Sequence, residues 1–143
     1  MSASSGVIGQ LLDVPPRAVI ALYAPADLVY GYANPMRPDV IKGNESLEMY
    51  LGGPPSRRLE TYRLASPRTW VDRRPLPPTL LLHGASDPMV ECLHSVLLAA
   101  ELQAAGQRVR QVCVPFGEHA FDMRPGSVGE QLARRAILEF LGS

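Results

Sequence analysis

Three kinds of side chain in this sequence could together cleave an acyl group: serine hydroxyls near the N-terminus, the Asp87 carboxylate and the His119 imidazole. In such a set the imidazole removes the serine proton, the carboxylate holds the imidazole in the required tautomer, and the serine oxygen attacks. The serines lie in the run Ser2-Ala3-Ser4-Ser5-Gly6. We therefore expect a hydrolytic site of nucleophile, acid and base, in that order along the chain.

These residues can meet only if the elements before them form a parallel sheet, and the apolar pattern predicts one. Short apolar runs are typical of strands buried on both faces, and apolar residues at helical spacing are typical of helices. The predicted strands are 18–23, 79–82 and 108–115, and the predicted helices are 7–12, 90–105 and 128–141. Strands that alternate with helices form right-handed βαβ units, so we predict an α/β fold with three parallel strands and flanking helices. Reactive groups in such sheets lie at the carboxyl ends of strands, where Asp87 and His119 fall.

The helices carry their own end signals. Gly106 is placed to cap the C-terminus of the helix at 90–105, and Ser127 with Glu130 predicts a capping box at the start of the last helix. His94 is expected to be solvated. Four residues recur at helical spacing on the first of these helices and are expected to face the core: Leu93, Leu97, Ala100 and Ala104.

The segment 31–68 differs from its surroundings. It is rich in proline and glycine, and its helical stretches are short, near 45–51 and 56–64. We interpret it as an irregular insertion or small cap over one edge of the sheet. The whole chain, 1–143, is then one partial catalytic domain.

Two strand-end segments resemble those of α/β-hydrolases. The first is Leu82-His83-Gly84-Ala85-Ser86-Asp87, in which an apolar residue precedes His-Gly and the acid follows three residues after the glycine. The second is Phe116-Gly117-Glu118-His119-Ala120-Phe121, in which a glycine precedes the histidine and a phenylalanine follows it. The order Ser, Asp, His is also that of the superfamily. Further segments resemble its esterase/lipase, carboxylesterase-like branch: 23–28, 50–53 and 65–67. The resemblance covers nearly the whole chain and implies the C-terminal half of the fold, with Asp87 as acid, His119 as base and His83 as a structural residue.

The nucleophile has two candidates. The superfamily places its serine in a G-x-S-x-G elbow, and Ser4 fits with Gly6 two residues after it and Ser2 in place of the first glycine. Ser2 is the alternative, with serines replacing both glycines that would follow. If Ser4 is the nucleophile, the resemblance implies that the backbone N–H of Ser5 is one donor of the oxyanion hole.

The resemblance implies a serine hydrolase that acts on small acyl esters or amides and needs neither a metal nor an organic cofactor. The alternative is a truncated, non-catalytic remnant or an assembly piece that needs a partner half. This alternative rests on the strands before the serine turn and the His-Gly-Gly oxyanion loop, which the sequence does not contain. The first strand would then expose an apolar edge, through which the chain could self-associate.

Composition narrows the partners further. Fourteen basic residues balance 14 acidic residues without a basic stripe, which argues against nucleic acid as a partner. No apolar run reaches the roughly 18 residues of a membrane span. No signal peptide is visible, so we expect a cytoplasmic location. Cys92 and Cys113 lie far apart without metal-ligand spacing and are expected to be buried or half-buried thiols.

Overall fold

A three-stranded parallel sheet forms the centre of the computed structural model, which describes residues 16–36, 41–73 and 75–142. Its strands are β1 (Val19–Leu22), β2 (Thr79–Gly84) and β3 (Val109–Val114), in the order β1-β2-β3. Val19 of β1 pairs with Thr79, which in turn pairs with Val109, so the strands start in register and end at one edge. The predicted α/β fold with three parallel strands is confirmed.

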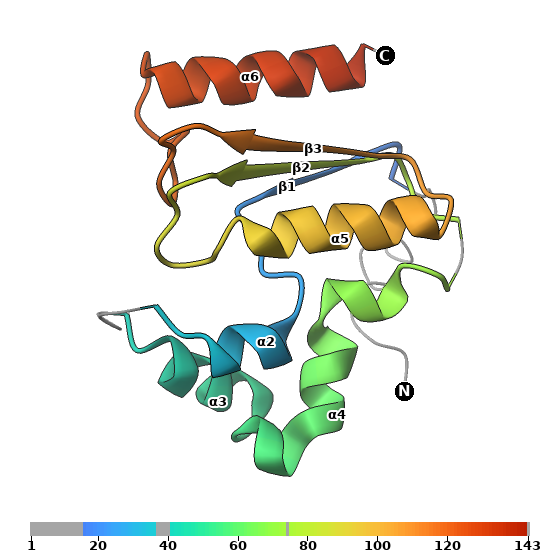
Figure 1. The fold of residues 1–143 in the computed structure, drawn as a ribbon, viewed down its shortest axis with the longest axis vertical. Helices are drawn as coiled ribbons and strands as arrows, with labels where there is room; N and C mark the ends of the chain where they lie inside the picture. Colours follow the sequence, from blue (N-terminus) through green and yellow to red (C-terminus); the bar gives the residue numbers. More distant parts are fainter. Residues whose placement is uncertain (1–15, 37–40, 74, 143) are drawn as a thin grey trace.

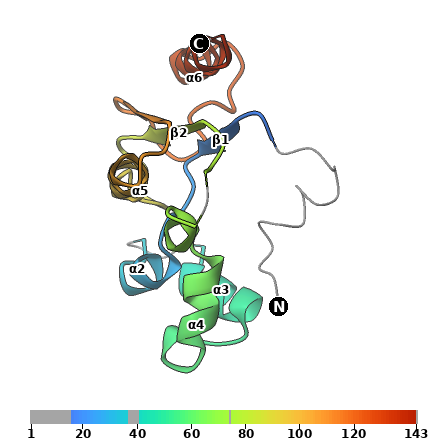
Figure 2. The same ribbon diagram turned by 90° about the vertical axis from the view of Figure 1, so that its right-hand side faces the viewer.

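Helices cover both faces of this sheet. Helix α5 (Leu93–Ala104) lies on one face and α6 (Val128–Leu141) on the other (Figure 1). Helices α2 (Leu28–Ala33), α3 (Gly43–Leu51) and α4 (Pro55–Ala65) gather beyond α5, on the side away from α6 (Figures 1 and 2). A short 3₁₀ helix, Pro67–Trp70, leads back toward β2. The helical stretches predicted near 45–51 and 56–64 are therefore present.

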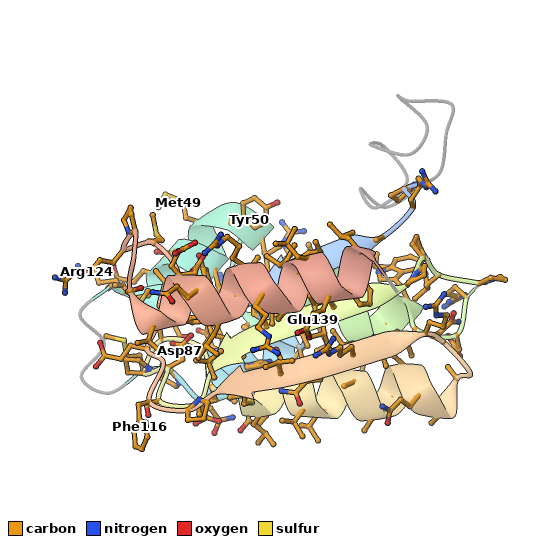
Figure 3. All side chains as sticks on the ribbon, turned by 90° about the horizontal axis from the view of Figure 1, so that it is seen from above. Met49, Tyr50, Asp87, Phe116, Arg124 and Glu139 are labelled. Carbon is orange, nitrogen blue, oxygen red and sulfur yellow. A yellow bond between two sulfur atoms is a disulfide. The ribbon has the colours of Figure 1, made fainter. Side chains whose placement is uncertain are left out.

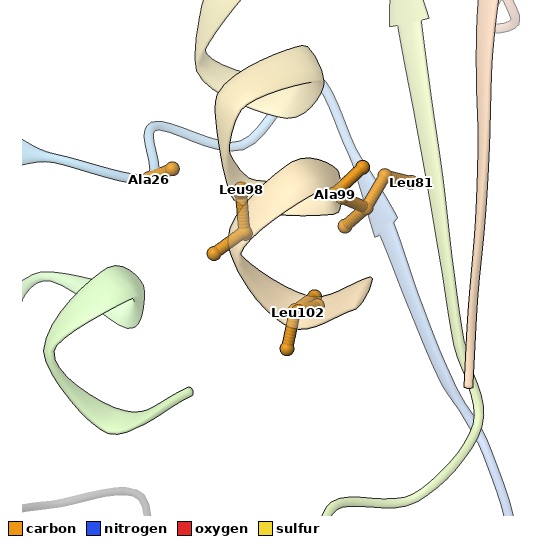
Figure 4. Packing of buried hydrophobic residues seen from close by; sticks show 5 residues of the cluster. All are labelled: Ala26, Leu81, Leu98, Ala99 and Leu102. Atoms are coloured by element: carbon orange, nitrogen blue, oxygen red, sulfur yellow. The ribbon is translucent and has the colours of Figure 1, made fainter. Parts of the chain in front are cut away.

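The leucines of β2 explain why this strand lies in the middle. Leu81 points to one face and packs in a cluster, shown in Figure 4, with Ala26 from the chain before α2 and three residues of α5: Leu98, Ala99 and Leu102. Leu80 and Leu82 point to the other face and pack against Ala133 and Ala136 of α6. Because apolar partners lie on both faces, the middle of this strand is a continuous run of leucines, which is the pattern that the sequence shows.

The buried face of α5 differs from the predicted one. Leu93 and Leu97 are 42% and 45% exposed, whereas the residues that face inward are His94, Ser95, Leu98, Ala99 and Leu102. Apolar residues occur all round this helix, so helical spacing alone does not select a face. The buried face is the one that carries Ser95 and His94, because each finds a hydrogen-bond partner in the interior. Ser95 bonds to His83, and His94 bonds to the chain before α2.

His94 joins the sheet domain to the segment that begins with α2. Its Nδ1 accepts hydrogen bonds from the backbone N–H groups of Ala26, at 3.2 Å, and Asp27, at 3.4 Å. The Asp27 carboxylate caps α2 by accepting from the N–H groups of its first turn, and Arg68 pairs with both Asp27 and Glu101 of α5. The expectation that His94 is solvated is wrong, because the buried ring supplies the acceptor for the buried N–H of Ala26 and the partly buried N–H of Asp27.

Cys92 and Cys113 form a disulfide, so the expectation of two free thiols is also wrong. Cys92 is the residue before α5 and Cys113 lies in β3, which runs beside β2. Their Cα atoms are 6.7 Å apart, a separation that a disulfide can span. The spacing of the two residues in the sequence carries no signal of this contact, because the fold alone brings the start of α5 against β3. Disulfides persist in oxidising compartments, which weighs against the expected cytoplasmic location.

Membrane insertion through a helix finds no support in the described part of the chain. None of its helices combines the length with the apolar character that a bilayer crossing requires.

Reduction of the disulfide should destabilise the fold. The crosslink closes a loop of 21 residues, which in the chain-entropy model stabilises by about 3 kcal/mol. We expect guanidinium unfolding with and without a reductant to show a loss of this order. The Cys92→Ser/Cys113→Ser double variant should have the unfolding free energy of the reduced protein, and the reductant should not change it. Two titratable thiols in the native, unreduced chain would contradict the disulfide.

Stability should fall at acidic pH because of buried histidines. Burial lowers the pKa of His94 and that of His83 below the ordinary histidine value of about 6.5. At acidic pH the unfolded chain then binds protons that the folded chain does not. The contribution of the two neutral histidines to the unfolding free energy is therefore fully present above about pH 6.5, and it is lost as the pH falls through the lower folded pKa.

The His94→Asn variant separates the two histidines. An asparagine oxygen can accept from Ala26 and Asp27 but does not titrate, so the loss of unfolding free energy between pH 8 and pH 5 should become shallower. Urea unfolding at each pH measures this slope. Parallel slopes for the parent chain and the variant would remove His94 as a source of the pH dependence.

Candidate active site

Asp87 lies in the turn after β2, at the carboxyl end of the sheet (Figure 3). Its side chain is fully buried. Its Oδ1 accepts hydrogen bonds from the backbone N–H groups of Met89, at 2.8 Å, and Val90, at 3.0 Å. Its Oδ2 lies 2.9 Å from Nδ1 of His119. A buried carboxylate is costly unless hydrogen bonds replace its hydration, and here three donors do so.

His119 meets this carboxylate from the loop after β3. Because Oδ2 is a pure acceptor, the bond assigns the proton to Nδ1 and leaves Nε2 of a neutral imidazole as an acceptor. The side chain is 26% exposed, so the ring lies at the edge of the core. Within the described residues no hydrogen bond engages Nε2. The arrangement can therefore receive a proton from a hydroxyl that approaches from the open side.

Two glycines allow the two loops to meet. A Cβ on Gly84 would overlap the carbonyl oxygen of Gly117, and one on Gly117 would lie 3.1 Å from the Gly84 Cα. The N–H of Ser86 donates to the Gly117 carbonyl, at 2.9 Å, and the N–H of Ala85 donates to Val114, also at 2.9 Å. The glycines that the sequence resemblance singled out are thus packing requirements: they bring the loop of the acid against the loop of the base.

His83 supports the acid from behind. It is fully buried, its Nε2 lies 2.7 Å from the Val90 carbonyl and 3.3 Å from Oδ2 of Asp87, and its Nδ1 lies 2.7 Å from Oγ of Ser95. The carbonyl requires a proton on Nε2, so Nδ1 accepts from the serine hydroxyl. Burial lowers the pKa of His83, which agrees with a neutral ring. His83 is thus a packed structural histidine, as predicted, and it also contacts the acid.

Sequence reasoning gave no site role to Tyr23 and Asp122. Tyr23 follows β1, and its ring centroid is 4.5 Å from that of His119. Asp122 lies three residues beyond His119 and has one buried carboxylate oxygen, Oδ1, without a hydrogen-bond partner in the described part of the chain. The place of Tyr23 at a strand end was the available signal, since three parallel strands deliver their next residues to one edge.

The predicted site residues fall into two groups. Asp87 and His119 are brought together, whereas Ser4, Ser2 and the N–H of Ser5 lie outside the described residues and remain expectations. Glu118, next to the histidine, is exposed. A buried carboxylate bonded to a half-exposed imidazole can act as the acid and base half of nucleophilic catalysis.

Comparison with known proteins gives a family match. A family model described as BD-FAE matches residues 11–102, well over half of the chain. Among curated proteins, the esterase LipQ of Mycobacterium tuberculosis is 35% identical over 82 residues, which span 57% of this chain and 19% of the esterase.

Solved structures match the fold over most of the chain. An esterase of Thermogutta terrifontis, Est2 with bound propionate, is 23% identical with a TM-score of 0.64, covering 87% of this chain and 42% of the esterase. An acylaminoacyl peptidase of Pyrococcus horikoshii is 22% identical with a TM-score of 0.69, covering 88% of this chain and 20% of the peptidase. This chain therefore spans less than half the length of these relatives.

Replacing Gly84 by alanine should separate the acid from the base. The new Cβ would lie 2.6 Å from the Glu118 carbonyl oxygen as well as against Gly117, so the loop after β3 must shift. Overpacking of this kind costs about 1–3 kcal/mol. Thermal unfolding measures the loss, and chemical shifts of the His119 ring report the displacement.

Gly31→Ala is the matched control. Its Cβ would meet the His94 ring only at 3.8 Å, in ordinary contact, and an alanine within a helix gains about 0.5–1 kcal/mol over glycine. Equal stability changes at the two positions would show that the ends of β2 and β3 are not closely packed.

Proposed function

Because the chain belongs to the BD-FAE family, in the esterase branch of the α/β-hydrolases, we propose that it is a serine carboxylesterase-type hydrolase. Asp87 is the acid, His119 is the base and Ser4 is the nucleophile, with Ser2 as the other candidate. The N–H of Ser5 supplies one donor of the oxyanion hole. The substrates are small acyl esters or amides.

The observation that carries this proposal is the hydrogen bond between the buried Asp87 carboxylate and Nδ1 of His119, 2.9 Å long. The carboxylate orients the imidazole and stabilises the imidazolium that forms when Nε2 takes a proton. The Asp87 side chain has no exposure, so water does not compete for its oxygens. An acid held in this way has a single geometry to offer the base, which is what proton transfer requires.

The reaction then follows from the positions of the protons. Nε2 of His119 takes the serine proton as the serine oxygen attacks the acyl carbon, and the imidazolium returns a proton to the leaving alcohol or amine. Water then attacks the acyl group on the serine through the same two proton transfers, and the carboxylic acid product is released. Each transfer uses the same nitrogen, so the free side of the imidazole must face the substrate.

A short acyl group is the favoured substrate class. The Thermogutta esterase, which shares the fold, was solved with propionate bound. We interpret the segment 31–68 as a cap, because it follows the carboxyl end of β1, the edge from which the Asp87 and His119 loops also leave. A cap at that edge would limit the length of the acyl chain.

The second candidate function is an assembly piece that needs a partner half. It is favoured by the position of β1, whose outer edge pairs with no strand in the described residues. An unpaired strand edge can add a strand from another chain, so self-association through β1 belongs to this candidate.

Hydrolysis of p-nitrophenyl acetate by the 143-residue chain tests the first function. Asp87→Asn should lower kcat about 10⁴-fold, as the loss of a triad acid does elsewhere, and His119→Ala should have an effect of similar size. Glu118→Gln changes an exposed neighbour of the base and is the control, with unchanged turnover. Wild-type rates in the Asp87 or His119 variants would rule out their assigned roles.

Labelling with a fluorophosphonate identifies the nucleophilic serine and distinguishes the hydrolase from the assembly piece. Mass spectrometry should find the adduct on Ser4 and none in the Ser4→Ala variant, whereas an adduct on Ser2 would move the assignment there. A folded chain that forms no adduct and hydrolyses no ester contradicts autonomous catalysis and favours the assembly piece.

A further inference from the structure

Tyr23 has an unusual backbone for its residue type. It is the first residue after β1 and has a φ of 42°, in the left-handed region that side chains other than glycine rarely adopt. Its N–H donates to the Leu82 carbonyl, at 2.7 Å, which extends the pairing of β1 with β2 by one residue. A strained residue held by its neighbours at the edge of a site is a reason to look for a role there.

The strained backbone directs the Tyr23 ring at the base. The ring centroid lies 4.5 Å from that of the His119 imidazole with 54° between the planes, and 6.3 Å from that of Phe121 in an edge-on contact. Among the residues that the structure describes, one hydrogen bond, from Nδ1 to Asp87, otherwise holds the imidazole, and one bond leaves the ring free to rotate about it. A tyrosine ring at this distance blocks that rotation on one side.

Asp122 is a carboxylate near the hydroxyl end of the tyrosine. Burial raises the pKa of the Tyr23 hydroxyl, and the carboxylate of Asp122 raises it further. The phenol is therefore neutral at physiological pH and can donate to that carboxylate. The tyrosine is thus held at its backbone by β2, and its hydroxyl can donate to a carboxylate in the loop of His119.

We propose that Tyr23 is a positioning residue for His119: its ring restrains the imidazole so that Nδ1 stays on Asp87 and Nε2 stays directed to the open side. This role rests on the proposed function, because it matters only if His119 is the base. It goes beyond the acid and base themselves in assigning part of the site to β1, the strand that precedes the 31–68 segment.

NMR of the chain labelled with ¹⁵N-histidine tests this role without requiring catalysis. The hydrogen-bonded Nδ1 proton of His119 should give a downfield resonance, assigned by its loss in His119→Asn. Tyr23→Phe, which keeps the ring, should retain the resonance. Tyr23→Gly, which removes the ring and suits the positive φ, should broaden it or lose it. Tyr23→Leu retains apolar volume and serves if the glycine variant does not fold.

Lys42→Gly is the matched control for relief of backbone strain. Lys42 also has a positive φ, of 51°, but it is exposed and lies at the start of α3. The Lys42→Gly variant should leave the His119 resonance unchanged.

In a catalytically active chain, loss of the Tyr23 ring should lower kcat about 10²-fold, the size expected of a misplaced catalytic group, with KM little changed.

The outcomes separate this inference from the function on which it rests. A downfield resonance that persists unchanged in both Tyr23→Gly and Tyr23→Leu overturns the positioning role and leaves the Asp87–His119 pair intact. A folded parent chain without any such resonance overturns the pair, and the positioning role with it.

Discussion

Gly84 and Gly117 lie so close together that a Cβ on Gly84 would overlap the Gly117 backbone and one on Gly117 would be crowded against Gly84. The loops that carry Asp87 and His119 meet at this contact. It joins the ends of β2 and β3, and the hydrogen bond from Ser86 to Gly117 then fixes the two loops against each other. Asp87 and His119, which are separated in the sequence by a helix and a strand, meet as a result. Backbone packing thus brings Asp87 and His119 into contact, and the attraction between their side chains then adds to it.

Burial gives the pair its chemical character. The Asp87 carboxylate has exchanged water for two backbone N–H groups and one imidazole, with a second histidine, His83, close by. Fixed donors of this kind cannot reorient, so the carboxylate keeps its direction when the charge on His119 changes. The half-exposed imidazole lies between this rigid interior and the solvent, and Tyr23 covers one side of it.

The sequence predicted well what depends on local pattern. The three apolar strands, the Gly106 and Ser127 helix ends and the loops of Asp87 and His119 are all present, because each has a backbone or packing reason that a short segment contains. It failed where distant segments decide. The buried face of α5, the acceptor role of His94 and the disulfide all depend on contacts with β2, β3 or the chain before α2. Tyr23 was missed for the same reason, since its proposed role comes from contact with the His119 ring in the loop after β3.

The disulfide encloses α5 and most of β3 but neither member of the pair, since Asp87 precedes Cys92 and His119 follows Cys113. The connection between α5 and β3, near Gly106, is exposed and lies inside this loop. A protease that cut the chain there would therefore yield two pieces, the acid on one and the base on the other, still joined covalently. In an oxidising medium the two pieces of such a nicked molecule stay joined, and they can come apart only where the crosslink is reduced.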